Sequence, residues 1–167
     1  MIGTETATIE HTRIATGLSY DALVVAFERE LGHLDPKLTE DLVKRKASWD
    51  DVKRAIDRVG GPHGLMVIFR ADQGQITSLS GREKRCSLYL VGNPVIANEI
   101  IDIDPRASFY VPFRVCLYDN GDDLGVMAYD RPSSFLAALE RPELTSFGQL
   151  LDQKIDAVAN LVGNAEV

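Results

Sequence analysis

The sequence is poor in the features that define several classes of protein. It contains two cysteines, Cys86 and Cys116, among 167 residues, which are too few for a disulfide-stabilised scaffold. It has no apolar run long enough to span a bilayer. Its first residues, M-I-G-T-E-T-A-T, lack the basic and apolar blocks of a signal peptide. We therefore expect a soluble, cytoplasmic protein without a membrane partner.

Positive charge is also scarce. The 18 Lys and Arg residues are outnumbered by 25 Asp and Glu residues, which gives a formal net charge of −7. General nucleic-acid binding requires a basic surface, so nucleic acid is not an expected partner.

Motifs that hold metals, cofactors or nucleophiles are missing as well. The three histidines, His11, His33 and His63, are scattered and have no cysteine near them, so no zinc site is expected. The sequence has no P-loop, no dinucleotide-binding fingerprint and no G-x-S-x-G motif. No spacing joins its carboxylates and histidines as a catalytic dyad or triad. We expect no metal and no cofactor, and we predict that the two cysteines are free thiols on opposite faces of a sheet.

The chain has enough apolar residues to fold around one core. With 45% hydrophobic residues, it is predicted to form a single domain over residues 1–167. A strand over Thr6–Ala15 at a sheet edge is followed by three helices, for which Ser19, Thr39 and Ser48 are the predicted N-caps.

From Gly64 onward the hydrophobic pattern changes to a period of two, which is typical of strands. The elements predicted in this part are strands over residues 65–70, 75–80 and 85–91, a helix capped by Asn93, a hairpin at Asn120-Gly121 and a C-terminal helix from Ser146. The predicted fold class is α+β, with a mostly antiparallel, curved sheet and helices packed on one of its faces.

The stretch S-F-Y-V-P-F-R-V-C-L-Y, residues 108–118, is the most informative predicted strand. Side chains alternate between the two faces of a strand. One face is entirely apolar and is expected to pack on helices: Phe109, Val111, Phe113, Val115 and Leu117. The other face places a guanidinium between phenols: Ser108, Tyr110, Pro112, Arg114, Cys116 and Tyr118.

Four segments together resemble a known family. They are G-L-M-V-I-F-R-A-D-Q-G, then Tyr89 with G-N-P-V-I-A, then Y-V-P-F-R-V-C-L-Y, and finally A-Y-D-R-P-S-S. The region from Gly64 to Asp152 resembles the "domain of unknown function 302" family. The resemblance implies a compact fold similar to the TATA-binding-protein class, often dimeric. It implies neither an activity nor DNA binding, because fold does not carry function.

Arg114 is the strongest candidate for a functional residue. A guanidinium in an apolar strand must find partners. It could pair internally with a carboxylate such as Asp130 or Asp102, or with backbone carbonyls, or it could bind the carboxylate or phosphate of a ligand. Asn93 is a further candidate, because the free N–H groups at a helix start can bind anions, although capping alone also explains it.

The tyrosines around Arg114 are the other candidates. Tyr89, Tyr110, Tyr118 and Tyr129 could line one wall of a pocket, or they could form a dimer interface. If Asn120-Gly121 forms a two-residue turn, Arg114 lies opposite Met127, and Tyr129 joins the Arg114 face. Asp130 then points to the helix side.

Three hypotheses for function follow from these residues. The first is a module that binds a small anionic or aromatic molecule at Arg114 and the tyrosines. The second is a structural homodimerisation domain without a ligand. The third is a cofactor-independent enzyme with a Tyr or Asp acid–base, for which Tyr129 and then Tyr110 are the candidates. In each case the uncovered sheet face predicts a homodimer.

Overall fold

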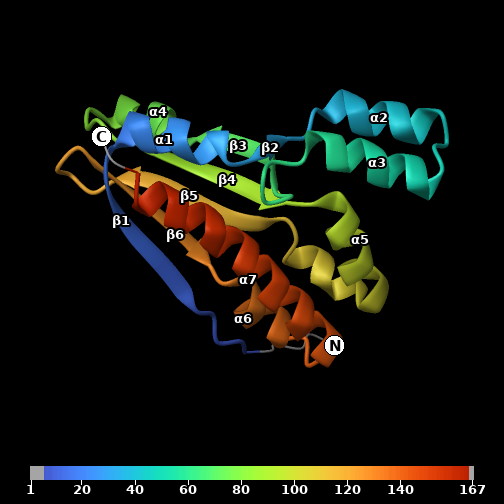
Figure 1. The fold of residues 1–167 in the computed structure, drawn as a ribbon. Helices are drawn as coiled ribbons and strands as arrows, with labels where there is room; N and C mark the ends of the chain where they lie inside the picture. Colours follow the sequence, from blue (N-terminus) through green and yellow to red (C-terminus); the bar gives the residue numbers. More distant parts are fainter. Residues whose placement is uncertain (1–5, 166–167) are drawn as a thin grey trace.

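A computed structural model of the protein describes residues 6–165. Within them the chain forms an α+β fold, which confirms the predicted class (Figure 1). The strands are β1 His11–Ser19, β2 Gly32–His33, β3 Met66–Asp72, β4 Cys86–Gly92, β5 Phe113–Asp119 and β6 Leu124–Asp130. The α-helices are α1 Tyr20–Arg29, α2 Pro36–Lys44, α3 Trp49–Val59, α4 Gln73–Thr77, α5 Pro94–Ile103, α6 Pro132–Ala137 and α7 Pro142–Gly163. Two short 3₁₀ helices are η1 Ser78–Ser80 and η2 Pro105–Phe109.

The strands form one sheet in the order β1-β6-β5-β4-β3-β2. All neighbouring strands are antiparallel except β2 and β3, which are parallel. The first strand lies at an edge, as predicted, although it begins at His11 rather than at Thr6.

Local capping chemistry positions most of the helices. The Ser19 hydroxyl accepts a hydrogen bond from the backbone N–H of Ala22, and Asn93 caps α5, both as predicted. The prediction of Thr39 as the cap of the second helix is wrong. Asp35 caps α2, because its carboxylate accepts from the backbone N–H of Lys37 and Pro36 fits the first turn.

Residues 75–80 were predicted to form a strand, and this prediction is wrong. The carboxylate of Asp72 accepts a hydrogen bond from the backbone N–H of Gln75 at 2.9 Å and starts the helical segment α4–η1. Gly74 permits the close packing of this segment, because a Cβ there would lie 2.3 Å from the backbone oxygen of Lys84.

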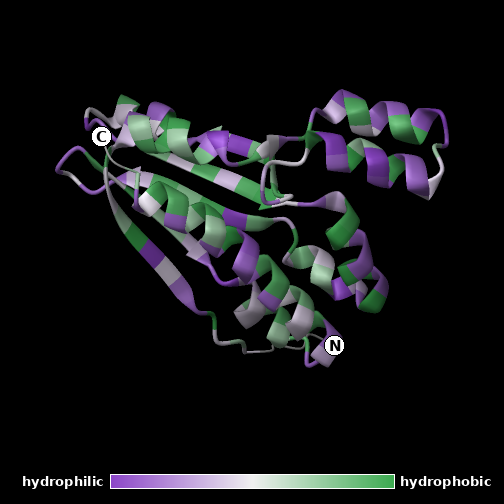
Figure 2. Ribbon diagram, viewed as in Figure 1, coloured by the Kyte–Doolittle hydropathy of each residue, from purple (hydrophilic) through white to green (hydrophobic). Residues whose placement is uncertain are grey.

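Two helices, α1 and α7, cover one face of the sheet and contact each other across it. Their apolar sides face the strands (Figure 2). The sheet contributes the fully buried Leu117 and Met127, and α7 contributes Leu144 and Ile155. The last helix begins at Pro142, four residues before the predicted cap Ser146. We call the opposite side of the sheet, which the short segment α4–η1 covers in part, the open face.

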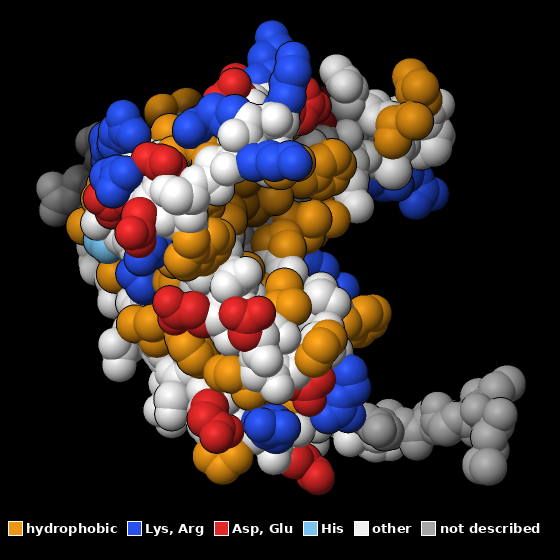
Figure 3. Space-filling model, turned by 90° about the vertical axis from the view of Figure 1, so that its right-hand side faces the viewer, with side chains coloured by type: hydrophobic (Ala, Val, Ile, Leu, Met, Phe, Trp, Pro, Cys, Tyr) orange, Lys and Arg blue, Asp and Glu red, His pale blue; other side chains and the backbone are white. Residues whose placement is uncertain are grey.

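The side of the molecule formed by α2, α3 and α5 is hollowed and lined by hydrophobic side chains (Figure 3). It lies at the right of Figure 1, at the end of the sheet where β4 runs into α5.

Candidate functional site

The predicted strand over residues 108–118 is shorter than expected. Pro105 starts the 3₁₀ helix η2, and the strand β5 begins only at Phe113. The Asp104 carboxylate fixes this start by accepting hydrogen bonds from the Arg106 backbone N–H and guanidinium, and these bonds lower the pKa of Asp104. Phe109 is therefore 83% exposed and does not belong to the core, whereas the other predicted apolar positions are buried.

The hairpin between β5 and β6 has a longer loop than predicted. Asp119 pairs with Gly125 rather than with Asp122, so the loop spans residues 120–123. The side chains of Asp119 and Asn120 each accept a hydrogen bond from a backbone N–H two residues later, and these Asx turns extend the connection.

This change of register moves β6 by an odd number of residues and reverses its faces. Tyr129 lies opposite Val115, and Met127 lies opposite Leu117. Both side chains point into the helix-covered core, so the prediction that they join the Arg114 face is wrong.

Tyr129 belongs to a polar network against α7. Its hydroxyl donates a hydrogen bond to Asp156 at 2.5 Å, and Arg131 donates two hydrogen bonds to the same carboxylate. Burial, together with the bond to Asp156, raises the pKa of Tyr129. Asp152 extends the network by accepting from the backbone N–H and the hydroxyl of Ser133. The Tyr129 hydroxyl therefore stabilises the packing of β6 against α7.

Tyr89 also lies on the helix side, opposite Val115 of β5, rather than on the Arg114 face as predicted. Its ring packs edge-on against Phe27 at a centroid distance of 5.1 Å, and its hydroxyl donates to Glu28 at 2.8 Å. Burial and the neighbouring carboxylate raise the pKa of Tyr89. The Arg70 guanidinium lies over the ring and donates to Glu28 as well.

The amide of Asn93 makes three hydrogen bonds within the chain. Its oxygen accepts from the backbone N–H groups of Val95 and Ile96, and its nitrogen donates to the backbone oxygen of Gly64. Capping of α5 and the bond to Gly64 therefore explain why an asparagine stands at this position.

Arg114 lies on the open face and pairs with Asp130 at 3.0 Å, the carboxylate that the sequence had suggested. The expectation that Asp130 points to the helix side is wrong, for the reason of register given above. The other oxygen of Asp130 lies 2.7 Å from Nδ1 of His11 on β1. A row of His11, Asp130 and Arg114 thus crosses three adjacent strands. Sequence reasoning had not placed His11 in the site, because its position opposite Asp130 depends on the pairing of β1 with β6.

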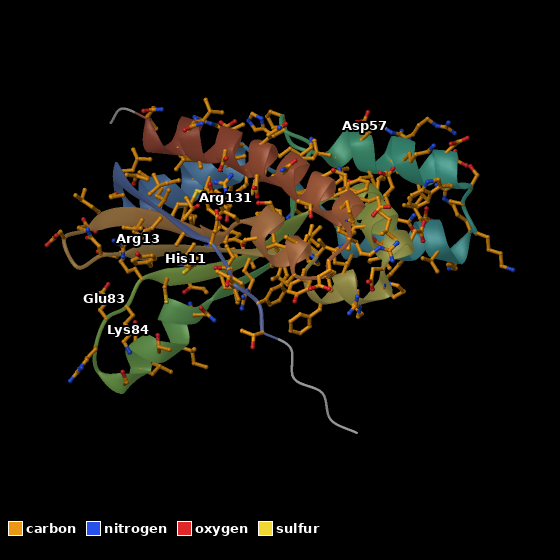
Figure 4. All side chains as sticks on the ribbon, turned by 90° about the horizontal axis from the view of Figure 1, so that it is seen from below. His11, Arg13, Asp57, Glu83, Lys84 and Arg131 are labelled. Carbon is orange, nitrogen blue, oxygen red and sulfur yellow. The ribbon has the colours of Figure 1, made fainter. Side chains whose placement is uncertain are left out.

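The open face carries further positive charge. Arg13 lies two residues from His11 on the same side of β1 (Figure 4), and it forms no ion pair with the described residues. Arg13 and Arg114 together outweigh the single negative charge of Asp130.

Aromatic rings lie beside Arg114. Tyr110 stacks on Phe135 with ring centroids 5.3 Å apart, and the exposed Phe109 ring stands edge-on to Tyr110. These rings, Arg114 and Asp130 line a groove of about 430 Å³, which we call the Arg114 groove. The structure therefore brings Tyr110 to Arg114, as predicted.

Tyr118 shares the open face with Arg114 but lies at the other end of β5, opposite Cys86. It lines a separate hollow with residues of the 83–86 and 119–123 loops. Leu88 pairs with Cys116, so both cysteines point to the open face, which corrects the prediction of opposite faces. Both are free thiols, as predicted.

Two further properties concern the described residues as a whole. None of their histidine, cysteine, aspartate and glutamate side chains gather in a group of three suited to a metal ion. Within residues 6–165, every helix is too short or too polar to cross a membrane.

The fold and the open face define a small α+β protein with a six-stranded sheet and a groove of basic and aromatic residues. The family described as "Domain of unknown function DUF302" matches residues 42–162, so the chain belongs to the DUF302 family. Among solved structures, a similar one is the crystal structure of an uncharacterized conserved DUF302 protein from Bacillus stearothermophilus.

That crystal structure supports the fold alone. It has 11% sequence identity and a TM-score of 0.64, and the match covers 91% of this chain and 97% of that chain. No curated protein matches the sequence.

Proposed function

We propose that this protein is a binding module for a small aromatic acid, held in the Arg114 groove. The observation that carries the proposal is a guanidinium that is mostly free. Its side chain is 65% exposed and donates one hydrogen bond, to Asp130. A guanidinium has five N–H donors, so four remain for a ligand.

The groove suits a flat ring joined to a carboxylate. Phe109 and Tyr110 offer two rings at right angles, which can contact a planar ligand on its face and its edge. Asp130 orients the guanidinium from one side, and Arg13 adds positive charge to the same face. Arginine binds carboxylates in a bidentate geometry, so the acid group belongs at Arg114 and the ring at Phe109.

Catalysis is not part of the proposal. Two phenols were candidates for an acid–base: Tyr129 points away from the groove and is held by Asp156, whereas Tyr110 lines the groove and stacks on Phe135. A group that acts on a substrate must come within hydrogen-bond reach of it.

Binding of naphthoate and of its uncharged analogue naphthamide tests the proposal. We expect Arg114→Met to weaken naphthoate binding about fivefold to tenfold, which corresponds to about 1 kcal/mol, and to leave naphthamide binding unchanged. Phe109→Ala should weaken both. The measurement is isothermal titration calorimetry, or chemical-shift titration when binding is weak.

Arg45→Met is the matched control. Arg45 also forms a single 3.0 Å ion pair with an aspartate on the surface, at a helix remote in sequence from the groove. Equal naphthoate affinities in the wild type, Arg114→Met and Arg45→Met proteins would refute the proposal. Native mass spectrometry of freshly purified protein would identify a bound acid directly.

Homodimerisation is a second candidate, favoured by the apolar side chains exposed on the open side. The segment α4–η1 lies on the side of the sheet opposite α7 (Figure 4). It exposes Ile76 and Leu79, and the open face itself exposes Phe69. Exposed apolar patches of this kind mark interfaces, and a second copy of the chain would present the same patch to it.

Light scattering at tens of micromolar separates a dimer from a monomer. We expect a dimeric mass that falls to that of a monomer in Phe69→Glu. Val25→Glu, at an exposed apolar position on α1 behind the covered face, should remain dimeric. A monomeric wild-type protein would exclude this candidate without affecting ligand binding in the Arg114 groove.

A further inference from the structure

A second cavity lies beside α5 and shares residues 111–113 with the Arg114 groove. Its volume is about 340 Å³, and we call it the α5 cavity. One wall is α5, from Asn93 to Ile101, and the other comes from the ends of β3 and β4 and from residues 111–113. It belongs to the hollowed, hydrophobic side of the molecule in Figure 3.

The sequence of α5 shows that the cavity is more than an accident of packing. The helix, P-V-I-A-N-E-I-I-D-I, has apolar residues around most of its circumference, and a helix of this kind is normally buried on all sides. Ile100 is fully buried, yet Ile96, Ala97 and Ile101 are only partly buried and line the cavity. Apolar side chains are thus kept at positions that the rest of the described chain covers only in part.

Small residues keep the space open. Ala97 occupies the helix wall, where most of its apolar neighbours are isoleucines. Gly92, the last residue of β4, lines the cavity without a side chain. A Cβ at this position would lie 3.3 Å from Cβ of Pro112, another residue of the lining.

The lining defines the charge of the occupant, because no charged side chain lines the cavity. A carboxylate or ammonium group transferred there would lose its hydration without an ionic partner. Two polar side chains are present. The Asn93 oxygen already accepts two hydrogen bonds at the start of α5, whereas Asn98 donates to Asp102 through its nitrogen and retains its carbonyl oxygen as an acceptor. One donor group on a ligand is the polar contact that this wall can match.

The volume of the α5 cavity limits the size of the molecule that it can bind. At about 30 Å³ for each water molecule, the cavity corresponds to roughly eleven waters, or to an organic molecule of roughly 15 non-hydrogen atoms. Ligand pockets of about 300 Å³ and more are typical of small-molecule sites.

From these observations we infer that the α5 cavity binds an uncharged, apolar small molecule that carries at most one hydrogen-bond donor, directed at Asn98. This cavity and the proposed acid site share residues 111–113 as part of their lining, but Arg114 and Asp130 line only the acid site. The two have opposite preferences for charge, so each can fail without the other.

The probe is N-phenylnaphthylamine, an uncharged fluorescent compound with one N–H donor. We expect its fluorescence to rise on binding and decanol to displace it, while decanoate, which has the same chain length and a negative charge, does not displace it. Ala97→Trp fills the cavity and should weaken binding about tenfold or more. Arg114→Met should leave probe binding unchanged.

Ala22→Trp is the matched control, because Ala22 is an exposed alanine on α1, far from the cavity lining. It should bind the probe as the wild type does. If circular dichroism shows that Ala97→Trp does not fold, the smaller change Ala97→Leu replaces it and should weaken binding severalfold. Unchanged binding in the folded Ala97 variant, or equal displacement by decanol and decanoate, would overturn the inference.

Discussion

Asp152 is the residue whose replacement tests the internal organisation of the fold most directly. It lies on α7, its side chain is 8% exposed, and it is one of the few buried charged groups of the described chain. Its carboxylate accepts hydrogen bonds from the backbone N–H of Ser133 at 3.1 Å and from the Ser133 hydroxyl at 2.5 Å. The Arg131 guanidinium lies 3.2 Å from it. These contacts fix the connection that follows Asp130, the partner of Arg114.

The magnitude of an Asp152→Ala change follows from these contacts. Hydrogen bonds to a charged acceptor contribute about 1.5–3 kcal/mol each. Arg131 keeps Asp156 as a partner, and alanine relieves the cost of burying a carboxylate. The free energy of unfolding should therefore fall by about 2–3 kcal/mol, which corresponds to a decrease in Tm of about 5–10 °C for a chain of this length.

Urea denaturation followed by circular dichroism measures this loss. Asp57→Ala is the control, because the Asp57 side chain is exposed on α3 and makes no hydrogen bond within the described residues (Figure 4). It should change stability by less than about 0.5 kcal/mol. A double-mutant cycle with Ser133→Ala should give a coupling energy of about 1 kcal/mol. A loss below about 1 kcal/mol in Asp152→Ala, relative to the control, would refute this account of the α6–α7 junction.

Two further predictions concern buried tyrosines and a close helix contact. Burial raises the pKa of Tyr89 and of Tyr129; their contribution to stability is therefore complete below the ordinary tyrosine pKa of about 10 and is lost as pH rises above it. The free energy of unfolding should therefore fall as pH rises through that range. The double variant Tyr89→Phe/Tyr129→Phe should show a smaller decrease with pH. An equal decrease in the wild type and the double variant would show that these two tyrosines do not cause it. Gly148→Ala should destabilise the protein by about 1–3 kcal/mol despite the better helix propensity of alanine, because a Cβ there would lie 2.5 Å from Cα of Ser133. Gly17→Ala, with nothing within 4 Å of the added Cβ, should be nearly neutral in the same urea experiment.

The features that were predictable from the sequence depend on local chemistry. Ser19, Ser48 and Asn93 cap their helices, because the bond from a side chain to a backbone group two or three residues away is encoded in a short segment. The buried face of β5 followed from alternation alone, since Phe113, Val115 and Leu117 share one parity.

The parts that the sequence did not reveal depend on small changes with long-range effects. Asx turns at Asp119 and Asn120 lengthened one loop, and this alone moved Tyr129 to the opposite face of the sheet. The pairing of His11 with Asp130 joins residues 119 positions apart, which no local pattern encodes. Patterns within short segments therefore identified Arg114 and Tyr110 as residues of the groove. They could not place His11 beside Asp130 or show that Tyr89 lies on the opposite face of the sheet.

The position of β1 beside β6 has a consequence for the order in which the chain can fold during synthesis. Among the described residues, β1 has one neighbour in the sheet, and that neighbour is the last of the six strands to be synthesised. At synthesis rates of about 5–20 residues per second, β6 follows β1 after on the order of ten seconds. The helix that follows it, α1, also rests on β5, β6 and α7. The β3–β4 hairpin can form early, whereas the N-terminal strand remains a candidate for chaperone binding until residue 130 has emerged.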